Sequence, residues 1–225
     1  MIDLRGDASQ VATAIILVVA ALFPIVNPFG SAAIFLEMTG PISSPLRDLL
    51  ARKISTFSFL LLIGSMLFGA RILTFFGVSL YAVQIGGGLV VAATGWALLN
   101  QTGSGATARS AAEKDILANA FYPYTLPVTV GPGSISVAIT LGANLPAELH
   151  ASSFLSPIVL IASFIGVVLI CVVVYVSYRY ANAAERLLGA TGTSVLMRLL
   201  SFILLCIGVQ IAANGIRSFL AIALK

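Results

Sequence analysis

Two short stretches combine proline, glycine and small polar residues inside runs that are otherwise apolar. They are "FPIVNPFGS" at 23–31 and "LPVTVGPGS" at 126–134. Proline has no N–H group and clashes with the preceding turn of a helix, so each stretch should break a helix that enters it. Asn27 and Gly131 would then cap a second helix, because both residue types are accepted at the N-cap and proline is favoured directly after it.

A break of this kind can bind a charged small molecule through main-chain groups. The helix that begins after the break presents free N–H groups and the positive end of its dipole, which suits a carboxylate. The helix that ends before the break presents free carbonyl groups and the negative end of its dipole, which suits an ammonium group or a cation. Both poles lie close together, and this pairing matches a zwitterion such as an amino acid.

The candidate binding residues lie at the breaks or are polar residues within apolar runs. Gly30 and Gly133 have no side chain, so a ligand could approach the main chain there. Gln84 and Gln210 occupy corresponding runs in the two halves of the chain, and they could line the site or form hydrogen bonds between helices. The full set is Asn27, Pro28, Phe29, Gly30, Gln84, Thr129, Gly131, Pro132, Gly133, Ser134 and Gln210.

The composition predicts an integral membrane protein. Of the 225 residues, 59% are hydrophobic and 9% are charged, whereas soluble proteins average about 25% charged residues. The net charge of +4 is not gathered into a basic cluster of the kind that binds nucleic acid. We therefore expect the lipid bilayer, and no nucleic acid, as a partner.

Six apolar segments are expected to cross the membrane. They are 11–38, 54–76, 79–100, 116–142, 155–178 and 195–220. A straight span needs about 20 residues, and the first and fourth segments, which contain the breaks, exceed that length. Pro24 is expected to end the first half-helix of the first segment near residue 22, and Pro127 is expected to end that of the fourth, so that both breaks fall near the midplane of the bilayer.

The order of the segments indicates an internal duplication in a single membrane domain, 1–225. Each half has one broken segment followed by two plain ones, with repeat 1 at 1–101, repeat 2 at 116–225 and a Gly/Ser-rich linker at 102–115. Three spans in a repeat would insert the second repeat upside down relative to the first. The expected fold is an all-α membrane protein with six transmembrane segments in two inverted three-helix repeats, the first and fourth segments being broken into half-helices.

Lysine and arginine residues predict the orientation in the membrane. With six spans, one side receives Arg47, Arg52, Lys53, Arg109, Lys114, Arg179, Arg186 and Arg198, and the other receives Arg5, Arg71, Arg217 and Lys225. The more positive side of a membrane protein is cytoplasmic. Both termini are therefore expected outside the cytoplasm.

The residues at both breaks resemble the motifs of a known family. "NPFGSAAIFLEMTG" at 27–40 and "LPVTVGPGSISVAI" at 126–139 resemble the paired N-P-x-G and G-P-G motifs of the MarC family, also described as the neutral amino acid transporter family. The resemblance covers nearly the whole chain, and a more distant one links it to LysE-type amino acid exporters. It implies an inner-membrane protein with six helices, and some members of the family move small neutral amino acids such as alanine and glycine. Glu37 departs from the pattern, because a small or neutral polar residue is expected there.

The sequence therefore predicts a secondary transporter of small neutral amino acids, in which one repeat rocks against the other to give alternating access. A passive channel, or an exporter of another small solute, is the alternative. We expect no enzyme activity and no cofactor, because the chain has neither a nucleotide-binding loop nor paired carboxylates, a cysteine pair or a Ser/His arrangement at membrane depth. The coupling ion, H⁺ or Na⁺, stays open, as do the role of Glu37 and the formation of a homo-oligomer.

Overall fold

Helices make up nearly all of the structure. The computed structural model describes residues 4–39, 42–100, 113–148 and 157–223, and these ranges contain no strand. The elements are α1 (Leu4–Val26), α2 (Pro28–Thr39), α3 (Ser44–Phe75), α4 (Leu80–Leu99), α5 (Glu113–Ala118), η1 (Ala120–Thr129), α6 (Pro132–Glu148), α7 (Pro157–Arg179) and α8 (Ala181–Ala223). Within the described ranges, five segments are long and apolar enough to span a membrane, or six if the bent pair of η1 and α6 counts as one span. The expected all-α membrane fold is confirmed at this level.

Two of the expected segments match observed helices closely, whereas two others are predicted to begin later in the sequence than the observed helices do. The segments expected at 79–100 and 155–178 correspond to α4 and α7. In contrast, α3 and α8 begin about ten residues or more before the expected 54–76 and 195–220, since polar first turns extend these helices beyond their apolar parts. The linker expected at 102–115 lies largely outside the described residues.

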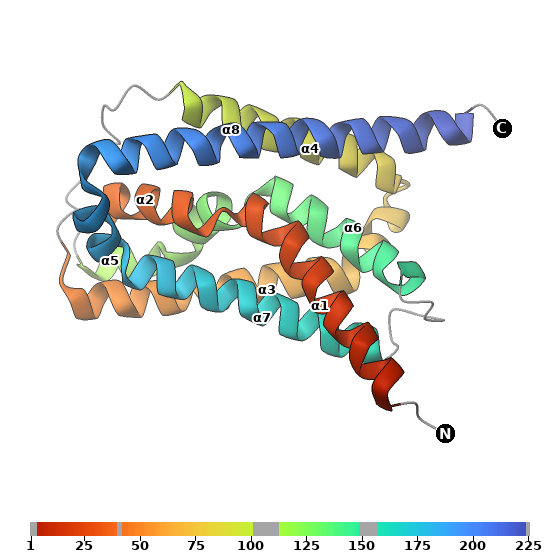
Figure 1. The fold of residues 1–225 in the computed structure, drawn as a ribbon, viewed down its shortest axis with the longest axis horizontal. Helices are drawn as coiled ribbons and strands as arrows, with labels where there is room; N and C mark the ends of the chain where they lie inside the picture. The colour runs from red at the N-terminus through yellow and green to blue at the C-terminus, as the bar shows by residue number, and fades with distance from the viewer. Residues whose placement is uncertain (1–3, 40–41, 101–112, 149–156, 224–225) are drawn as a thin grey trace.

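Figure 1 shows how the helices are layered. The pair α4 and α8 forms one outer layer, while α3 and α7 lie on the opposite side of the molecule. Between them lie α2, η1 and α6, and α1 packs along α7. The first residues of α1 and the last residues of α8 are at the same end of the molecule (Figure 1).

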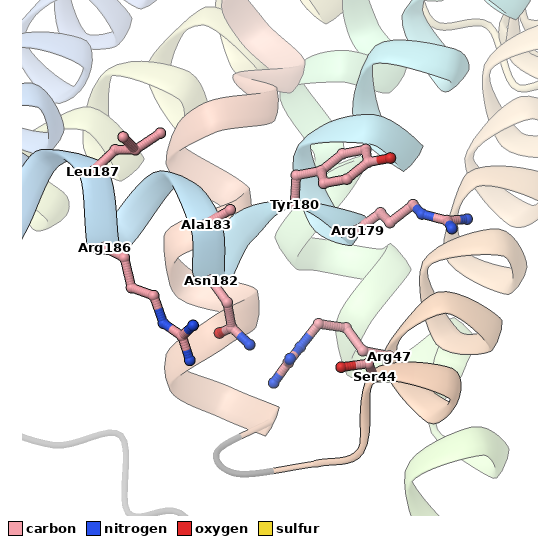
Figure 2. Close-up of a pocket in the computed structure, with 8 residues that line it drawn as sticks. All are labelled: Ser44, Arg47, Arg179, Tyr180, Asn182, Ala183, Arg186 and Leu187. Carbon is pink, nitrogen blue, oxygen red and sulfur yellow. The ribbon is translucent and has the colours of Figure 1, made fainter.

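Basic side chains gather at the other end of the molecule, where α3 and α8 begin and α7 ends. These residues are Arg47, Arg52, Lys53, Arg179 and Arg186. Figure 2 shows that three of them, one each from α3, α7 and α8, lie around one pocket. The end that gathers these basic side chains thus lies opposite the first residues of α1 and the last residues of α8.

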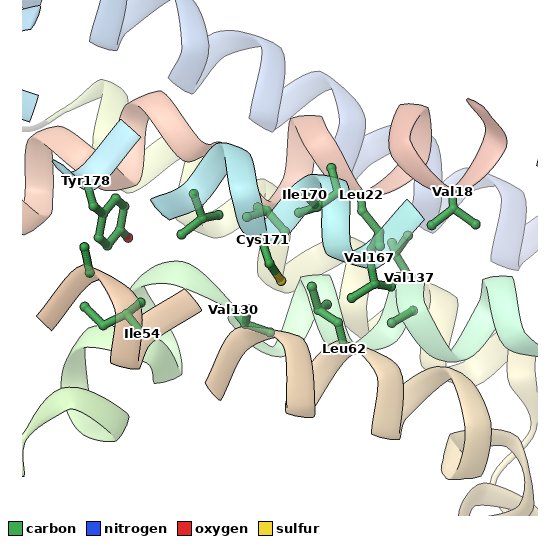
Figure 3. Close-up of a cluster of buried hydrophobic side chains, with 14 of the residues drawn as sticks. Val18, Leu22, Ile54, Leu62, Val130, Val137, Val167, Ile170, Cys171 and Tyr178 are labelled. Carbon is green, nitrogen blue, oxygen red and sulfur yellow. The ribbon is translucent and has the colours of Figure 1, made fainter. Parts of the chain in front are cut away.

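The apolar core lies where α1, α3, α7 and the start of α6 meet (Figure 3). Leu22 of α1, Leu62 of α3 and Ile170 of α7 are completely buried. Val130, between η1 and α6, is also completely buried and joins the second break to this core. Of the described spans, α7 is the most enclosed and α4 is the least.

Glycine residues determine the contact between α4 and α8. A Cβ atom on Gly88 would lie 2.5 Å from the backbone nitrogen of Ala212, and one on Gly208 would lie 2.7 Å from the carbonyl oxygen of Gly88. The two backbones can approach this closely only because both positions lack a side chain. Gly95 faces Leu205 in the same way, so residue numbers rise along α4 as they fall along α8. These helices are therefore antiparallel.

The contacts between α3 and α7 follow the same antiparallel order. The Ser55 hydroxyl donates a hydrogen bond to the Cys171 carbonyl oxygen at 2.7 Å. One turn further along α3, the ring of Phe59 meets that of Phe164 edge-on, with the ring centroids 5.5 Å apart. The second spans of the two halves, α3 and α7, are therefore antiparallel to each other, and so are the third spans, α4 and α8.

Candidate binding site at the two helix breaks

The first break is a single residue, Asn27, between α1 and α2. Its φ of +46° lies in the left-handed region, which asparagine adopts more readily than most residues with a side chain. Its Oδ1 atom accepts a hydrogen bond from the Gly30 N–H at 3.2 Å, and its carbonyl oxygen accepts one from the Ser31 N–H at 2.9 Å. Asn27 is therefore the N-cap of α2, and Pro28 is the first residue of that helix, as predicted.

The prediction that α1 ends before Pro24 is wrong. The helix continues to Val26, and the Asn27 N–H donates to the Phe23 carbonyl oxygen at 3.0 Å. Proline removes only one bond of the helix, and membrane helices tolerate this loss where neighbouring groups compensate for it. The interruption is narrower than expected, and residues 10–36 form one apolar span.

Gly30 makes room for the cap itself. A Cβ atom at this position would lie 2.3 Å from Nδ2 of Asn27. A side chain here would therefore displace the amide that caps the helix, which explains the glycine two residues after Pro28. Phe29 lies on the outside, 49% exposed, and its ring packs edge-on against Phe23.

The second break is longer and irregular. The backbone is extended at Tyr122 (φ −125°, ψ 124°) and at Leu126 (φ −110°, ψ 120°), and the peptide bonds to Pro123 and Pro127 are cis. The axis bends by 70° between η1 and α6. The prediction of a regular half-helix that ends at Pro127 is therefore wrong, and the short α5 and the irregular η1 stand in its place. Two prolines, one turn apart, remove two donors from the helical ladder, so a regular helix cannot pass through.

The start of α6 agrees with the prediction. The Gly131 carbonyl oxygen accepts the N–H of Ile135 at 3.1 Å, and Pro132 is the first residue of the helix. Gly133 is buried against α4, where a Cβ atom would lie 2.0 Å from Cγ2 of Val91. The glycine therefore also serves the contact between these two helices.

Tyr178 of α7 brings the two breaks together. Its hydroxyl oxygen lies 2.6 Å from Oγ1 of Thr129, at the end of η1, and it also interacts with the hydroxyl of Ser31, in the first turn of α2. Thr129 donates in turn to the Tyr124 carbonyl oxygen at 2.7 Å. The Tyr178 ring is completely buried and stacks on Phe35, with the ring centroids 4.5 Å apart. Hydroxyl groups from three elements thus meet inside the apolar bundle.

The sequence predictions missed Tyr178. It stands in "VVVYVSYRY" at 172–180, between Tyr175 and Tyr180. Tyrosine near the end of an apolar run usually marks the membrane interface, so this one did not stand out from its neighbours. The available signal was that a buried tyrosine needs a partner for its hydroxyl, and Thr129 was already a candidate.

The structure places the two glutamines differently. Gln84 is half-buried on α4, next to Val83, whose carbonyl oxygen accepts a hydrogen bond from the Ser136 hydroxyl of α6 at 2.8 Å. Gln84 therefore lies on the helix that packs against the start of α6. Gln210 is on the exposed face of α8 and donates to Oδ1 of Asn214 at 3.0 Å.

The contact between the breaks is closed in this structure. Ser31, Thr125, Thr129 and Ser134 are each at most 3% exposed. The two cavities that stand out in the described part of the chain are lined by residues of α3, α7 and α8 instead. A ligand could reach the breaks only after this contact opens. The side chain of Glu37 lies outside the described part of the chain.

Comparisons with known proteins identify the family. A family model described as "MarC family integral membrane protein" matches residues 12–220. The chain is 31% identical over 202 residues to the inner membrane protein MarC of Escherichia coli strain K12 and of Shigella flexneri, covering 87% of this chain and 90% of each relative. It is 30% identical, with the same coverage, to the protein of that name from Citrobacter koseri. No solved structure matches the chain. The apolar helices, the paired breaks and these matches together show that the chain is a multi-pass membrane protein and belongs to the MarC family.

Proposed function

We propose that the protein is a secondary transporter for a small zwitterion, a neutral amino acid of the size of alanine or glycine, in the bacterial inner membrane. The observation that carries the proposal is the meeting of the two breaks at the Tyr178 hydroxyl. Irregular backbone at membrane depth is tolerated only where it is buried in protein or lines a wet cavity. A purely structural helix bundle needs neither two breaks nor their contact, whereas a transporter needs polar groups there to bind its substrate.

The helix contacts support an arrangement of two inverted repeats. The broken segment of each half packs on the second span of the other half, α1 on α7 and α6 on α3. The second spans are antiparallel to each other, and so are the third spans. This exchange of partners is what an internal two-fold axis relating 1–101 to 116–225 predicts.

The substrate carboxylate is assigned to the start of α6. In the first break, the side chain of Asn27 already occupies the N–H of Gly30. Among the described residues, no partner is found for the N–H groups of Gly133 or Ser134. A helix start with free donors and the positive end of the dipole suits an anion. The substrate ammonium is assigned to main-chain carbonyl groups of the irregular segment η1, which precedes this break.

The orientation proposed for the chain places both termini outside the cytoplasm. The end of the molecule that carries Arg47, Arg52, Lys53, Arg179 and Arg186 lies opposite the first residues of α1 and the last residues of α8 (Figure 1). By the positive-inside rule, the basic end faces the cytoplasm.

Flux of labelled alanine and glycine into vesicles that contain the purified protein tests this function. Gly133→Leu forces a side chain against Val91 directly beside the free donors, and Pro28→Ala removes the residue that starts α2, so both should reduce flux. Gly86→Leu is the matched control, because a Cβ atom on Gly86 has nothing within 4 Å. Normal flux in both site variants would remove the site assignment.

A second measurement separates the carrier from the alternative, a passive channel or an exporter of another small solute. In a carrier, substrate outside the vesicle accelerates the efflux of labelled substrate, and the effect saturates. A pore gives a flux that rises in proportion to concentration without such exchange. The absence of any alanine or glycine flux in the unmodified protein would point to another solute.

A further inference from the structure

A cavity of about 390 Å³ opens at the basic end of the molecule. Figure 2 shows it between the start of α3, the end of α7 and the first turns of α8. Its lining consists of Ser44, Arg47, Arg179, Tyr180, Asn182, Ala183, Arg186 and Leu187. Three arginines from three helices thus surround one space, together with the hydroxyl groups of Ser44 and Tyr180 and the amide of Asn182, which can also donate hydrogen bonds.

Two of the arginine side chains converge on the same part of this cavity. In Figure 2, Arg47 extends from α3 toward Asn182, and Arg186 extends from α8 on the same side. Arg47 is only 5% exposed. Arginine side chains commonly extend from the protein surface to water, whereas these two line the same cavity.

The acidic side chain described nearest the cavity is already engaged. Asp48 is the only acidic residue whose side chain the structure describes, and it binds Arg179 at 2.7 Å, Arg52 at 3.0 Å and the Tyr175 hydroxyl at 2.7 Å. No ion pair is found for Arg186 among the described residues. Asp48 therefore does not balance the charge of Arg186.

Arginine has a planar fork of donors that matches the oxygen atoms of a phosphate group. An aliphatic and an aromatic side chain flank the opening: Leu187 is 87% exposed and Tyr180 is 55% exposed. The helix axis breaks shortly afterwards at Gly189, whose φ is +66°, so the first turns of α8 are set off from its long apolar part. A charged cavity flanked by exposed apolar and aromatic side chains is typical of the membrane interface.

We infer that this cavity binds the phosphate group of an anionic phospholipid from the cytoplasmic leaflet. Arg47 and Arg186 hold the phosphate oxygens, and Asn182 donates a further hydrogen bond. Leu187 and Tyr180 contact the upper part of the acyl chains. The inference does not depend on the transported substrate, since the cavity and the helix breaks share no lining residue.

The test uses the purified full chain in a non-ionic detergent, with binding followed by native mass spectrometry and by the shift in melting temperature. Phosphatidylglycerol should bind and raise the melting temperature, whereas phosphatidylcholine, which has no net charge, should not. Arg186→Gln should weaken the binding of phosphatidylglycerol about tenfold, since it removes a charge-assisted contact. Arg217→Gln is the matched control, an exposed arginine toward the other end of the same helix, and it should leave the affinity unchanged.

Further measurements keep the inference open to refutation. Asn182→Ala, at a half-buried position in the first turn of α8, changes no charge and should weaken binding less than Arg186→Gln does. Equal affinities of Arg186→Gln and Arg217→Gln for phosphatidylglycerol would overturn the site. If inorganic phosphate bound and phosphatidylglycerol did not, with the same loss in Arg186→Gln, the phosphate chemistry would stand and the lipid would be rejected as its source.

Discussion

The hydrogen bond between Tyr178 and Thr129 gives a direct test of the contact between the two breaks. The hydroxyl oxygens are 2.6 Å apart, and the two residues are 0% and 1% exposed. Tyr178→Phe removes one hydroxyl but keeps the ring that stacks on Phe35. A hydrogen bond contributes about 1 kcal/mol net in proteins and roughly 0.6 kcal/mol on average between membrane helices. We therefore expect Tyr178→Phe to lower the free energy of unfolding by about 1 kcal/mol.

Thr129→Val should cost more, because the threonine hydroxyl makes two contacts. It bonds to Tyr178 and also donates to the Tyr124 carbonyl oxygen at 2.7 Å. Removing it leaves a buried carbonyl group with fewer donors, which costs roughly 1–3 kcal/mol. Each single variant removes the hydrogen bond between Tyr178 and Thr129. The double variant should therefore lower the free energy of unfolding by about 1 kcal/mol less than the sum of the two single losses.

The assay is thermal unfolding in detergent, followed by the fluorescence of Trp96, the single tryptophan of the chain. A loss of 1 kcal/mol corresponds to about 2–4 °C for a chain of this size. Tyr180→Phe, at a ring that is 55% exposed, is the control and should leave the melting temperature unchanged. Single losses that add to within about 0.3 kcal/mol would refute the bond, and with it the meeting of the two breaks at Tyr178.

Two further predictions concern positions at which the backbone conformation or a close backbone contact restricts the side chain, and the same thermal unfolding assay tests them. Asn27→Ala should destabilise by about 1–2 kcal/mol, because it removes the cap on the Gly30 N–H and leaves a Cβ-bearing residue at φ +46°. Asn27→Gly also removes the cap but adopts the left-handed φ without strain, so it should lose only a few tenths, and equal losses would contradict the left-handed backbone at residue 27. Gly88→Ala should destabilise, because its Cβ atom would lie 2.5 Å from the backbone nitrogen of Ala212. Gly86→Ala has open space and should be neutral or stabilising by up to about 1 kcal/mol; a neutral Gly88→Ala would argue against the close helix contact.

The starts of α2 and α6 could be predicted because their determinants are local. Asn27 with Pro28, and Gly131 with Pro132, each place a cap and a residue of fixed φ side by side. The ends of the preceding segments could not be predicted in this way. Whether a proline ends a helix depends on whether neighbouring groups compensate for the lost bond, and at Pro24 the helix continues.

The contacts at the site depend on residues that are distant in sequence. Thr129 and Tyr178 are 49 residues apart, and no local pattern relates them. A glycine in the sequence also does not show which residue occupies the space where its side chain would be. Asn27 occupies that space at Gly30, and Val91 occupies it at Gly133. The part that these glycines play in binding a substrate stays a prediction.

The backbone contact of α4 with α8 has a mechanical consequence. These helices come from opposite halves of the chain, yet they touch main chain to main chain at Gly88 and Gly208. A hinge that swung one half away from the other would have to pull them apart along much of their length. A movement of α4 and α8 together, as one rigid body, relative to α2 and α6 would leave that contact intact. The rigid bodies of a transport cycle in this molecule would then each contain helices from both halves of the polypeptide.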